Sequence, residues 1–212
     1  GVSTQTFGGL CHWLINVLNA ITGNLDEPGG AMFSLPAVDT IAAEGKRESF
    51  GSFDSYRSKA RNLPEFGGEL PVSALADEIL FQGEGGVRAL ITSAGNPVLS
   101  TPNGGKLAQA LESLQLMVSI DIYLNETTKY AHYILPPTSP LEHDHYDIVF
   151  NMLAVRNTAR YSPPVFDPPA GTMHDWEIFT ALTAAMEEAR SGGAKKASSA
   201  RAKIKPTDFL DR

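Results

Sequence analysis

The chain has 212 residues, 42% of them hydrophobic, so it can bury a sizeable core in one large domain or one and a half small ones. Its formal net charge of −7 argues against a nucleic-acid-binding surface. A single cysteine, Cys11, excludes an internal disulfide and alone cannot hold an iron–sulfur cluster or a structural zinc ion, and no apolar run approaches the roughly 18 residues of a membrane span.

The N-terminal third is predicted to contain one helix and a long irregular segment. Apolar residues recur at helical spacing over residues 9–22, and Gly23 supplies a stop. Residues 24–70 are rich in Gly, Pro, Ser and charge, and so long a loop is uncommon in a compact domain unless it is functional or packs on something else. We therefore expect residues 1–70 to form a helix followed by an irregular excursion.

The next segment alternates between helical and strand patterns. Pro71 is expected at the start of a helix that Gly83 ends, and residues 87–92 are typical of a buried strand. Asn103 is expected to cap a helix over residues 103–114, and the apolar run 116–120 to form the next strand. Alternation of this kind predicts a parallel sheet.

The alternation continues almost to residue 190. A short helix is predicted over residues 126–131, a third strand over 133–135 and a last helix over 175–189. We therefore predict an α/β domain over residues 71–190, with a Rossmann-like parallel sheet and helices on both faces in a three-layer sandwich. The low-complexity, basic end of the chain, residues 191–212, is expected to be a flexible tail or linker.

A short polar run follows the first predicted strand and consists of Ser93, Ala94, Gly95, Asn96 and Pro97. The glycine lets the backbone turn sharply and approach a ligand, Asn96 offers side-chain donors, and free backbone N–H groups could bind a diphosphate. An ordinary turn between a strand and a loop is the alternative. No G-x-G-x-x-G run is present, so the usual NAD fingerprint is absent.

A carboxylate follows the second strand. Asp121 could accept hydrogen bonds from ribose hydroxyls or from guanine, whose N2 donor adenine lacks. The alternative is a solvated side chain or a cap for the following turn. Asn125, Thr127 and Thr128 add short polar side chains beside it, and these could equally be N-caps of the short helix.

The run Glu142, His143, Asp144 and His145 has the residue types of a metal site. On a strand the two imidazoles would face the same way, and with Glu142 or Asp144 they could bind a divalent ion. The run follows several prolines, however, and a loop has no fixed facing. A polar loop near a ligand is therefore the alternative.

Together these features resemble the molybdopterin oxidoreductase family, which is the dimethyl-sulfoxide-reductase superfamily and includes formate dehydrogenases. The resemblance covers about residues 1–190, with its matching stretches at Gln5 and at residues 13–30, 91–143 and 175–182. The ordered spacing of LNAITGN, GNP, D-x-x-x-N-E-T and LP-x-x-x-x-x-E carries the resemblance, because it is more specific than any one of these motifs.

The resemblance implies a molybdenum or tungsten ion bound through two molybdopterin guanine dinucleotides. The loop at Gly95 would touch one dinucleotide arm, Asp121 with Asn125 its nucleoside end, and Gln5 with Gly8 would lie nearer the pterin. The full set of residues that would bind the cofactor is Ser93, Gly95, Asn96, Pro97, Asp121, Asn125, Thr127, Gln5 and Gly8.

The sequence also departs from the family pattern. His132 stands where the family commonly has Asp, and the glycine usual shortly after the position of Glu142 is not obvious. Cysteines for an iron–sulfur cluster, a residue that ligates the metal and a C-terminal barrel domain are not visible. We therefore expect an internal fragment of a larger oxidoreductase that is inactive alone. Its partners would be the remaining domains of the same polypeptide, and any iron–sulfur cluster would be bound outside this fragment. A cytoplasmic location is favoured.

Three other interpretations remain open at this point. One is a different nucleotide-binding module, such as the central domain of a thiamine-diphosphate enzyme, which also has a parallel sheet without the glycine fingerprint. Another is a metal-dependent hydrolase that uses Glu142, His143 and His145. The last is a non-catalytic structural domain.

Overall fold

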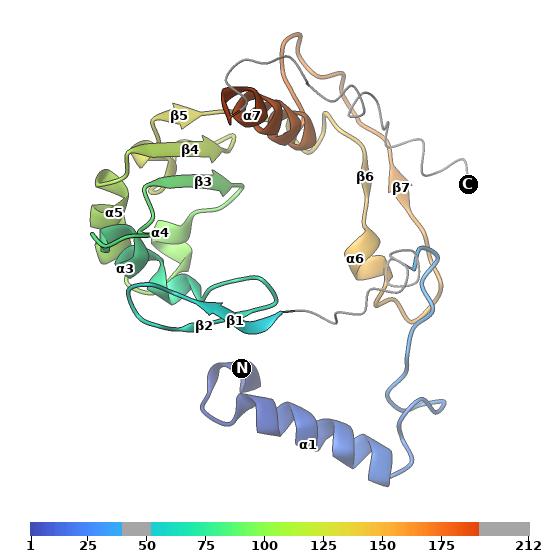
Figure 1. The fold of residues 1–212 in the computed structure, drawn as a ribbon. Coiled ribbons are helices and arrows are strands. Elements are labelled where there is room, and N and C mark those ends of the chain that lie inside the picture. The colour runs from blue at the N-terminus through green and yellow to red at the C-terminus, as the bar shows by residue number, and fades with distance from the viewer. Residues whose placement is uncertain (40–51, 191–212) are drawn as a thin grey trace. The chain divides into compact units, whose positions relative to one another are not determined.

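A computed structural model describes residues 1–39 and 52–190 of the chain (Figure 1). Contacts divide the described residues into two compact units. One contains residues 1–39 and 144–163, and the other contains residues 52–143 and 164–190. The predicted tail, residues 191–212, lies outside the described residues. No helix in the described ranges combines the length and apolar character needed to cross a membrane.

The larger unit is built on a parallel sheet of three strands in the order β3-β4-β5 (Figure 1). The strands are β3 (Ala89–Ser93), β4 (Leu116–Ile120) and β5 (Tyr133–Ile134). Ser93 pairs with Ile120, so β3 and β4 end at the same level of the sheet. The predicted α/β class and parallel sheet are confirmed, and loops that leave these two strands start side by side.

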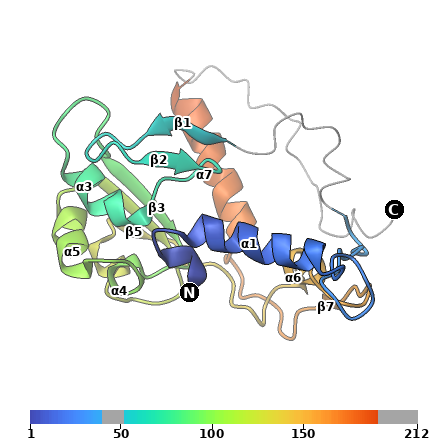
Figure 2. The ribbon, with the colours of Figure 1, turned by 90° about the horizontal axis from the view of Figure 1, so that it is seen from below.

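Helices α3 (Leu75–Leu80) and α5 (Gly104–Glu112) pack together on the same side of this sheet (Figures 1 and 2). A short 3₁₀ helix, η2 (Val72–Ala74), leads into α3, and α4 (Pro97–Ser100) precedes α5. Asn103 caps α5 as predicted, since its side chain accepts a hydrogen bond from the Lys106 N–H. The buried apolar core that these elements share consists of Ala76, Ile79, Leu107, Ala110, Leu111, Leu114 and Met117.

An antiparallel hairpin, β1 (Phe53–Arg57) with β2 (Pro64–Phe66), lies within the segment predicted to be irregular. The Glu65 side chain is 1% exposed and accepts hydrogen bonds from the Ser52 hydroxyl and from the backbone N–H groups of Ser55 and Gly68. Burial raises the pKa of the Glu65 carboxyl, but these hydrogen bonds outweigh it, so the pKa lies below its ordinary value. The hairpin therefore closes around a buried carboxylate.

The end of the larger unit contains η3 (Thr128–Tyr130), a 3₁₀ helix where a short helix was predicted, and α7 (Asp175–Arg190). Ile178 is the buried residue of α7. A single bridge between Pro137 and Met173 connects the segment after β5 with the segment before α7. The predicted last helix is confirmed: it begins at Asp175 as predicted and ends one residue later than predicted, at Arg190.

The smaller unit contains η1 (Val2–Thr4), α1 (Gly8–Ile21), α6 (Ile148–Asn151) and the two-residue strands β6 (His145–Tyr146) and β7 (Tyr161–Ser162). The strands pair antiparallel. The predicted N-terminal helix is confirmed within one residue at each end, whereas the sequence did not predict β6, α6 or β7. Both strands are too short to leave an alternating pattern.

Candidate functional site

The turn after β3 is made by an alanine and not by the glycine beside it. Ala94 has a φ of 48°, a left-handed conformation that is uncommon outside glycine, and its N–H donates to the Ile120 carbonyl at 2.9 Å. Gly95 does not have a positive φ. A Cβ at Gly95 would lie 3.5 Å from the Ser93 carbonyl oxygen and 4.0 Å from the Pro97 ring, which are ordinary contacts. Backbone geometry therefore does not require glycine here, and the absence of a side chain leaves space above the turn.

The loops after β3 and β4 are joined by Asn96. Its Oδ1 accepts a hydrogen bond from the Thr127 hydroxyl at 2.7 Å, and its Nδ2 donates to a Glu126 carboxylate oxygen at 2.7 Å. The Thr127 hydroxyl also accepts from the Val98 N–H, at 3.0 Å, in the first turn of α4. Thr127 is 0% exposed. These bonds hold the two loops in one arrangement at the carboxyl edge of the sheet.

Glu126 is a member of this arrangement that was not among the residues predicted to bind the cofactor, although it belongs to the D-x-x-x-N-E-T run. The hydrogen bond from the Asn96 side chain, followed by one from the backbone N–H of Glu126 itself, holds the pKa of its carboxyl below the ordinary value. The available signal was its place between Asn125 and Thr127, two residues that the sequence did single out. An exposed carboxylate therefore lies on the rim of the turn, and it is ionised at neutral pH.

Asp121 lies directly after β4 and is half-buried. One carboxylate oxygen accepts from the Tyr123 N–H at 2.9 Å, and the other accepts from the Asn125 side-chain amide at 3.2 Å. A carboxylate can accept about four hydrogen bonds, so these two bonds orient Asp121 and leave acceptor capacity for a ligand. The Asp121 side chain can thus cap the following turn and contact a ligand at the same time, so the two predicted roles are compatible.

Asn125 is mainly occupied by the local backbone. Its Oδ1 accepts from the N–H groups of Thr127 and Thr128, both at 2.9 Å, at the start of η3. This is the capping role that the sequence analysis kept as an alternative. Through its amide bond to Asp121, Asn125 also fixes the orientation of that carboxylate.

The two candidate residues of the smaller unit are involved in its local structure. Gly8 is required there, because a Cβ would lie 2.7 Å from the Val2 carbonyl oxygen and 2.9 Å from that of Ser3. Its N–H donates to the Gln5 carbonyl at 3.0 Å. The Gln5 side-chain amide reaches the Cys11 sulfur at 3.5 Å. Gln5 and Gly8 thus shape the turn into α1.

The run of metal-ligand residue types does not converge. Glu142 accepts from the Ser139 N–H at 2.8 Å, and Asp144 accepts from the Tyr161 hydroxyl at 3.1 Å. His145 belongs to β6, whereas His143 belongs to the other unit. Throughout residues 1–39 and 52–190, no three His, Cys, Asp or Glu side chains are grouped so as to hold a metal ion. The geometry therefore gives no support to a hydrolase built on this run.

His132, the departure from the family pattern, has a structural role. Its Nδ1 accepts from the Met117 N–H at 2.9 Å, and its own N–H donates to the Met117 carbonyl at 2.8 Å. Both bonds fasten the segment before β5 to β4.

Known proteins match this chain over most of its described length. A family model described as molybdopterin oxidoreductase matches residues 1–185. A nitrate reductase of Synechocystis is 31% identical over 193 residues, covering 82% of this chain and 26% of the relative. The thiosulfate reductase molybdopterin-containing subunit of Salmonella typhimurium is 26% identical over 183 residues, covering 80% and 24%. A formate dehydrogenase subunit alpha of Methanococcus maripaludis is 25% identical over 179 residues, covering 80% and 25%.

The chain spans about a quarter of the length of each of these three relatives. Their names specify different substrates, so similarity alone does not select one. The match is to a single family across both units of the chain, which disfavours the thiamine-diphosphate-enzyme interpretation.

Proposed function

We propose, from the premise that this chain belongs to the molybdopterin oxidoreductase family, that its α/β unit binds the guanine-dinucleotide end of the family's cofactor. The family implies a molybdopterin-type cofactor with molybdenum or tungsten. The finer assignment, two molybdopterin guanine dinucleotides on one metal ion, is part of the proposal. When bound, such a cofactor supplies two-electron transfer at the metal, and the protein positions and tunes it.

The residues at the strand ends fit a nucleotide. Space is left above Gly95, where a Cβ would meet only ordinary contacts, so the backbone can approach a ligand closely. The exposed hydroxyl of Ser93 lies just before it. Ala94 stands in a strained conformation of the kind that clusters at functional sites. In the proposal, residues 93–97 therefore contact one dinucleotide arm through backbone groups and the Ser93 hydroxyl.

Asp121 is proposed to bind the nucleoside end. Its carboxylate is half-buried, oriented by the Tyr123 N–H and the Asn125 amide, and has acceptor capacity left. Guanine offers an N2 donor that adenine lacks, so a fixed carboxylate favours guanine. A carboxylate oriented in advance loses little side-chain entropy on binding, which adds to its affinity for the nucleoside.

Asn96, Asn125 and Thr127 have a supporting part in this proposal. Their polar atoms are engaged between the two loops or with the start of η3. They set the distance between the Gly95 turn and Asp121, much as supporting residues around a bound group set the geometry of direct contacts. Gln5 and Gly8, in the other unit, are proposed to lie nearer the pterin, as the family resemblance implies.

The single observation that carries the proposal is the Asn96–Thr127 hydrogen bond within a chain of this family. It holds two ligand-type loops, which are 31 residues apart, at one edge of a parallel sheet. Ligands of open α/β sheets bind at the carboxyl ends of the strands. The metal site that the hydrolase interpretation needs has no group of three His, Cys, Asp or Glu side chains to form it among the described residues.

We also propose that the chain is part of a longer polypeptide, since it spans about a quarter of the length of the three relatives. Analysis of that full-length polypeptide tests the proposal. We expect the full-length protein to contain molybdenum or tungsten by elemental analysis and to release a guanine nucleotide on acid hydrolysis. The present chain alone should have no oxidoreductase activity and should bind guanine nucleotides weakly, since each cofactor is held by several parts of the polypeptide. A folded full-length protein with neither metal would refute the proposal, and one that releases cytidine nucleotide would refute its guanine assignment.

A further inference from the structure

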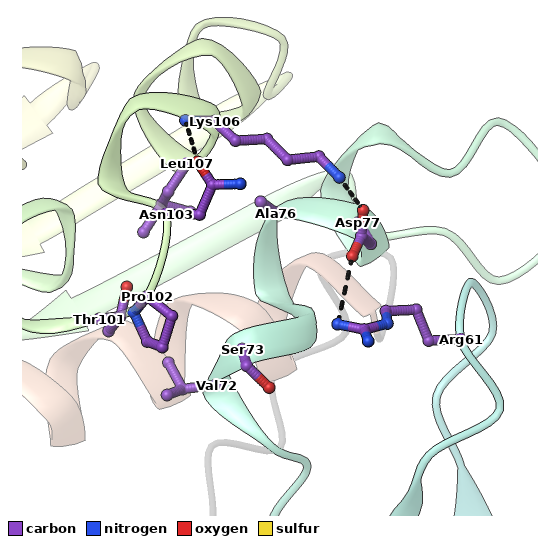
Figure 3. Close-up of a pocket in the computed structure, with 10 residues that line it drawn as sticks. All are labelled: Arg61, Val72, Ser73, Ala76, Asp77, Thr101, Pro102, Asn103, Lys106 and Leu107. Carbon is purple, nitrogen blue, oxygen red and sulfur yellow. Dashed lines mark hydrogen bonds and ion pairs between the residues drawn. The ribbon is translucent and has the colours of Figure 1, made fainter.

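A pocket of about 270 Å³ lies in the α/β unit between the N-terminal ends of α3 and α5 (Figure 3). Its walls come from η2 and α3, from the connection between α4 and α5, from α5 itself and from the tip of the β1–β2 hairpin. None of the residues proposed above to contact the cofactor lines it. The pocket is therefore separate from the proposed cofactor contacts. A ligand of this pocket is independent of the cofactor assignment.

The rim of the pocket carries two cations and one carboxylate. Lys106 of α5 forms an ion pair with Asp77 of α3, and the Arg61 guanidinium lies 3.7 Å from the other oxygen of the same carboxylate (Figure 3). The Lys106 hydrogen bond is the main reason that the pKa of Asp77 lies below its ordinary value, so the carboxylate is ionised at neutral pH. The three groups leave one excess positive charge in a chain whose net charge is −7.

Arg61 is held over the pocket by a separate anchor. The carboxylate of Glu78, which is 6% exposed, accepts the N–H of Lys59 at 2.9 Å and that of Ala60 at 2.7 Å. Ala60 directly precedes Arg61. The backbone of the hairpin tip is thus fixed to α3 directly before Arg61, whose side chain reaches Asp77 from there.

The remaining lining combines donors with an apolar floor. In Figure 3 the side-chain amide nitrogen of Asn103 points toward Ala76, across the space between the two helices. Val72, Pro102 and Leu107 supply apolar surface. Arginine, lysine and asparagine together offer more hydrogen-bond donors than Asp77 can use. A ligand rich in acceptors, with a small apolar body, matches this lining.

We propose that the pocket binds a small organic anion, whose acidic group meets Lys106 and Arg61 and whose apolar part rests on Val72, Pro102 and Leu107. Asp77 is then a competitor for the same two cations. In the free protein Asp77 keeps Lys106 and Arg61 oriented. When the anion binds, it takes over some of the N–H donors that these two side chains direct at Asp77. Phenyl phosphate is a suitable probe, with inorganic phosphate and phenol as its charged and apolar halves.

The substitution Asp77→Asn separates this proposal from a purely structural ion-pair network. Removing the competing carboxylate should tighten phenyl phosphate binding about fivefold, and Lys106→Gln should weaken it about fivefold, as expected for one charge at roughly 4 Å in water. Both substitutions break the same ion pair, so a purely structural role predicts that they change the affinity for phenyl phosphate in the same direction. Changes of the affinity in opposite directions are specific to an anion site.

The experiment is a titration of the 212-residue chain, followed by amide chemical shifts and by calorimetry. We expect saturable shifts at Ser73, Asp77, Asn103 and Lys106, weaker binding of inorganic phosphate, and none of phenol. Glu112→Gln on α5 and Lys129→Gln in η3 are matched controls that should leave the affinity unchanged. Absence of saturable binding, or a change of affinity of the same sign in Asp77→Asn and Lys106→Gln, would overturn the proposal. Neither result bears on the metal or nucleotide content of the full-length protein.

Discussion

The Thr127 hydroxyl donates a hydrogen bond to Asn96 Oδ1 at 2.7 Å, although the two residues are 31 positions apart. The same hydroxyl accepts the Val98 N–H, so one buried oxygen serves both loops and the start of α4. Neither loop has regular structure of its own over most of its length. Their relative position therefore depends on this side-chain pair, and the proposed cofactor contacts depend on that position.

Replacing Thr127 by valine should destabilise the protein by about 2–3 kcal/mol, because the change is nearly isosteric but leaves two partly buried partners, Asn96 Oδ1 and the Val98 N–H, unpaired. Urea unfolding of the purified chain measures this loss. Thr183→Val is the matched control, since the Thr183 hydroxyl donates to the Phe179 carbonyl on an exposed helix surface. A loss in Thr127→Val no larger than in Thr183→Val would mean that the two loops are held together by other contacts.

Two glycines of the same βαβ unit should respond differently to alanine. At Gly95 the added Cβ meets only ordinary contacts, so Gly95→Ala should change the free energy of unfolding by less than about 0.5 kcal/mol. At Gly104 the Cβ would lie 2.0 Å from the Val98 carbonyl oxygen, so Gly104→Ala should be strongly destabilising. In the full-length protein, Gly95→Ala should nevertheless lower the content of guanine nucleotide, because the methyl group occupies the space proposed for the ligand. Unchanged nucleotide content would remove Gly95 from the proposed contacts.

Much of the βαβ unit could be predicted from local sequence. The predicted strand 116–120 coincides with β4, and the Asn103 cap marks the start of α5, because apolar runs and caps act over a few residues. The β1–β2 hairpin could not be predicted in this way. Its closure depends on the buried carboxylate of Glu65, and its tip depends on Glu78, more than ten residues further along the chain. A buried acid surrounded by backbone N–H groups has no signature in hydrophobic periodicity.

The candidate site was predictable in its location but not in its internal bonds. Residues after two adjacent parallel strands must lie at one sheet edge, which placed Gly95 and Asp121 near the same edge in advance. The sequence did not reveal that Ala94 makes the turn, or that Thr127 and Glu126 bind Asn96. Such pairings are decided by side-chain directions across 30 or more residues, and a single sequence does not contain them.

The Glu65 carboxyl should make the stability of the hairpin dependent on pH. Its pKa in the folded chain lies below the ordinary value of 4.5, so the folded state binds the proton less readily than the unfolded state. The resulting stabilisation is complete above the unfolded pKa and is lost as the pH falls through the lower, folded pKa. Urea midpoints measured at a series of pH values should fall in this acidic window.

Glu65→Gln provides the variant for that measurement. In glutamine one carboxylate oxygen is replaced by an amide nitrogen, which cannot accept a hydrogen bond and would face a backbone N–H donor. The urea midpoint at neutral pH should therefore be lower than in the parent chain. The acid-dependent part of the decline should also be smaller. Glu112→Gln, an exposed glutamate on α5, should leave both quantities unchanged. Parallel pH profiles for the parent chain and Glu65→Gln would contradict the assigned role of Glu65.

Asp121→Asn tests the proposed nucleoside contact. Asparagine retains an acceptor for the Tyr123 N–H but presents an amide to the Asn125 amide and loses an acceptor for the ligand. A hydrogen bond to a charged group contributes about 1.5–3 kcal/mol, so guanine nucleotide retained by the full-length protein should be held at least about tenfold more weakly. The measurement is guanine nucleotide released per polypeptide by acid hydrolysis after extensive dialysis. Asp167→Asn, at an exposed aspartate, is the control, and urea unfolding of both variants checks that each is folded to the same extent. Equal nucleotide content in equally folded Asp121→Asn and Asp167→Asn would place the nucleoside elsewhere.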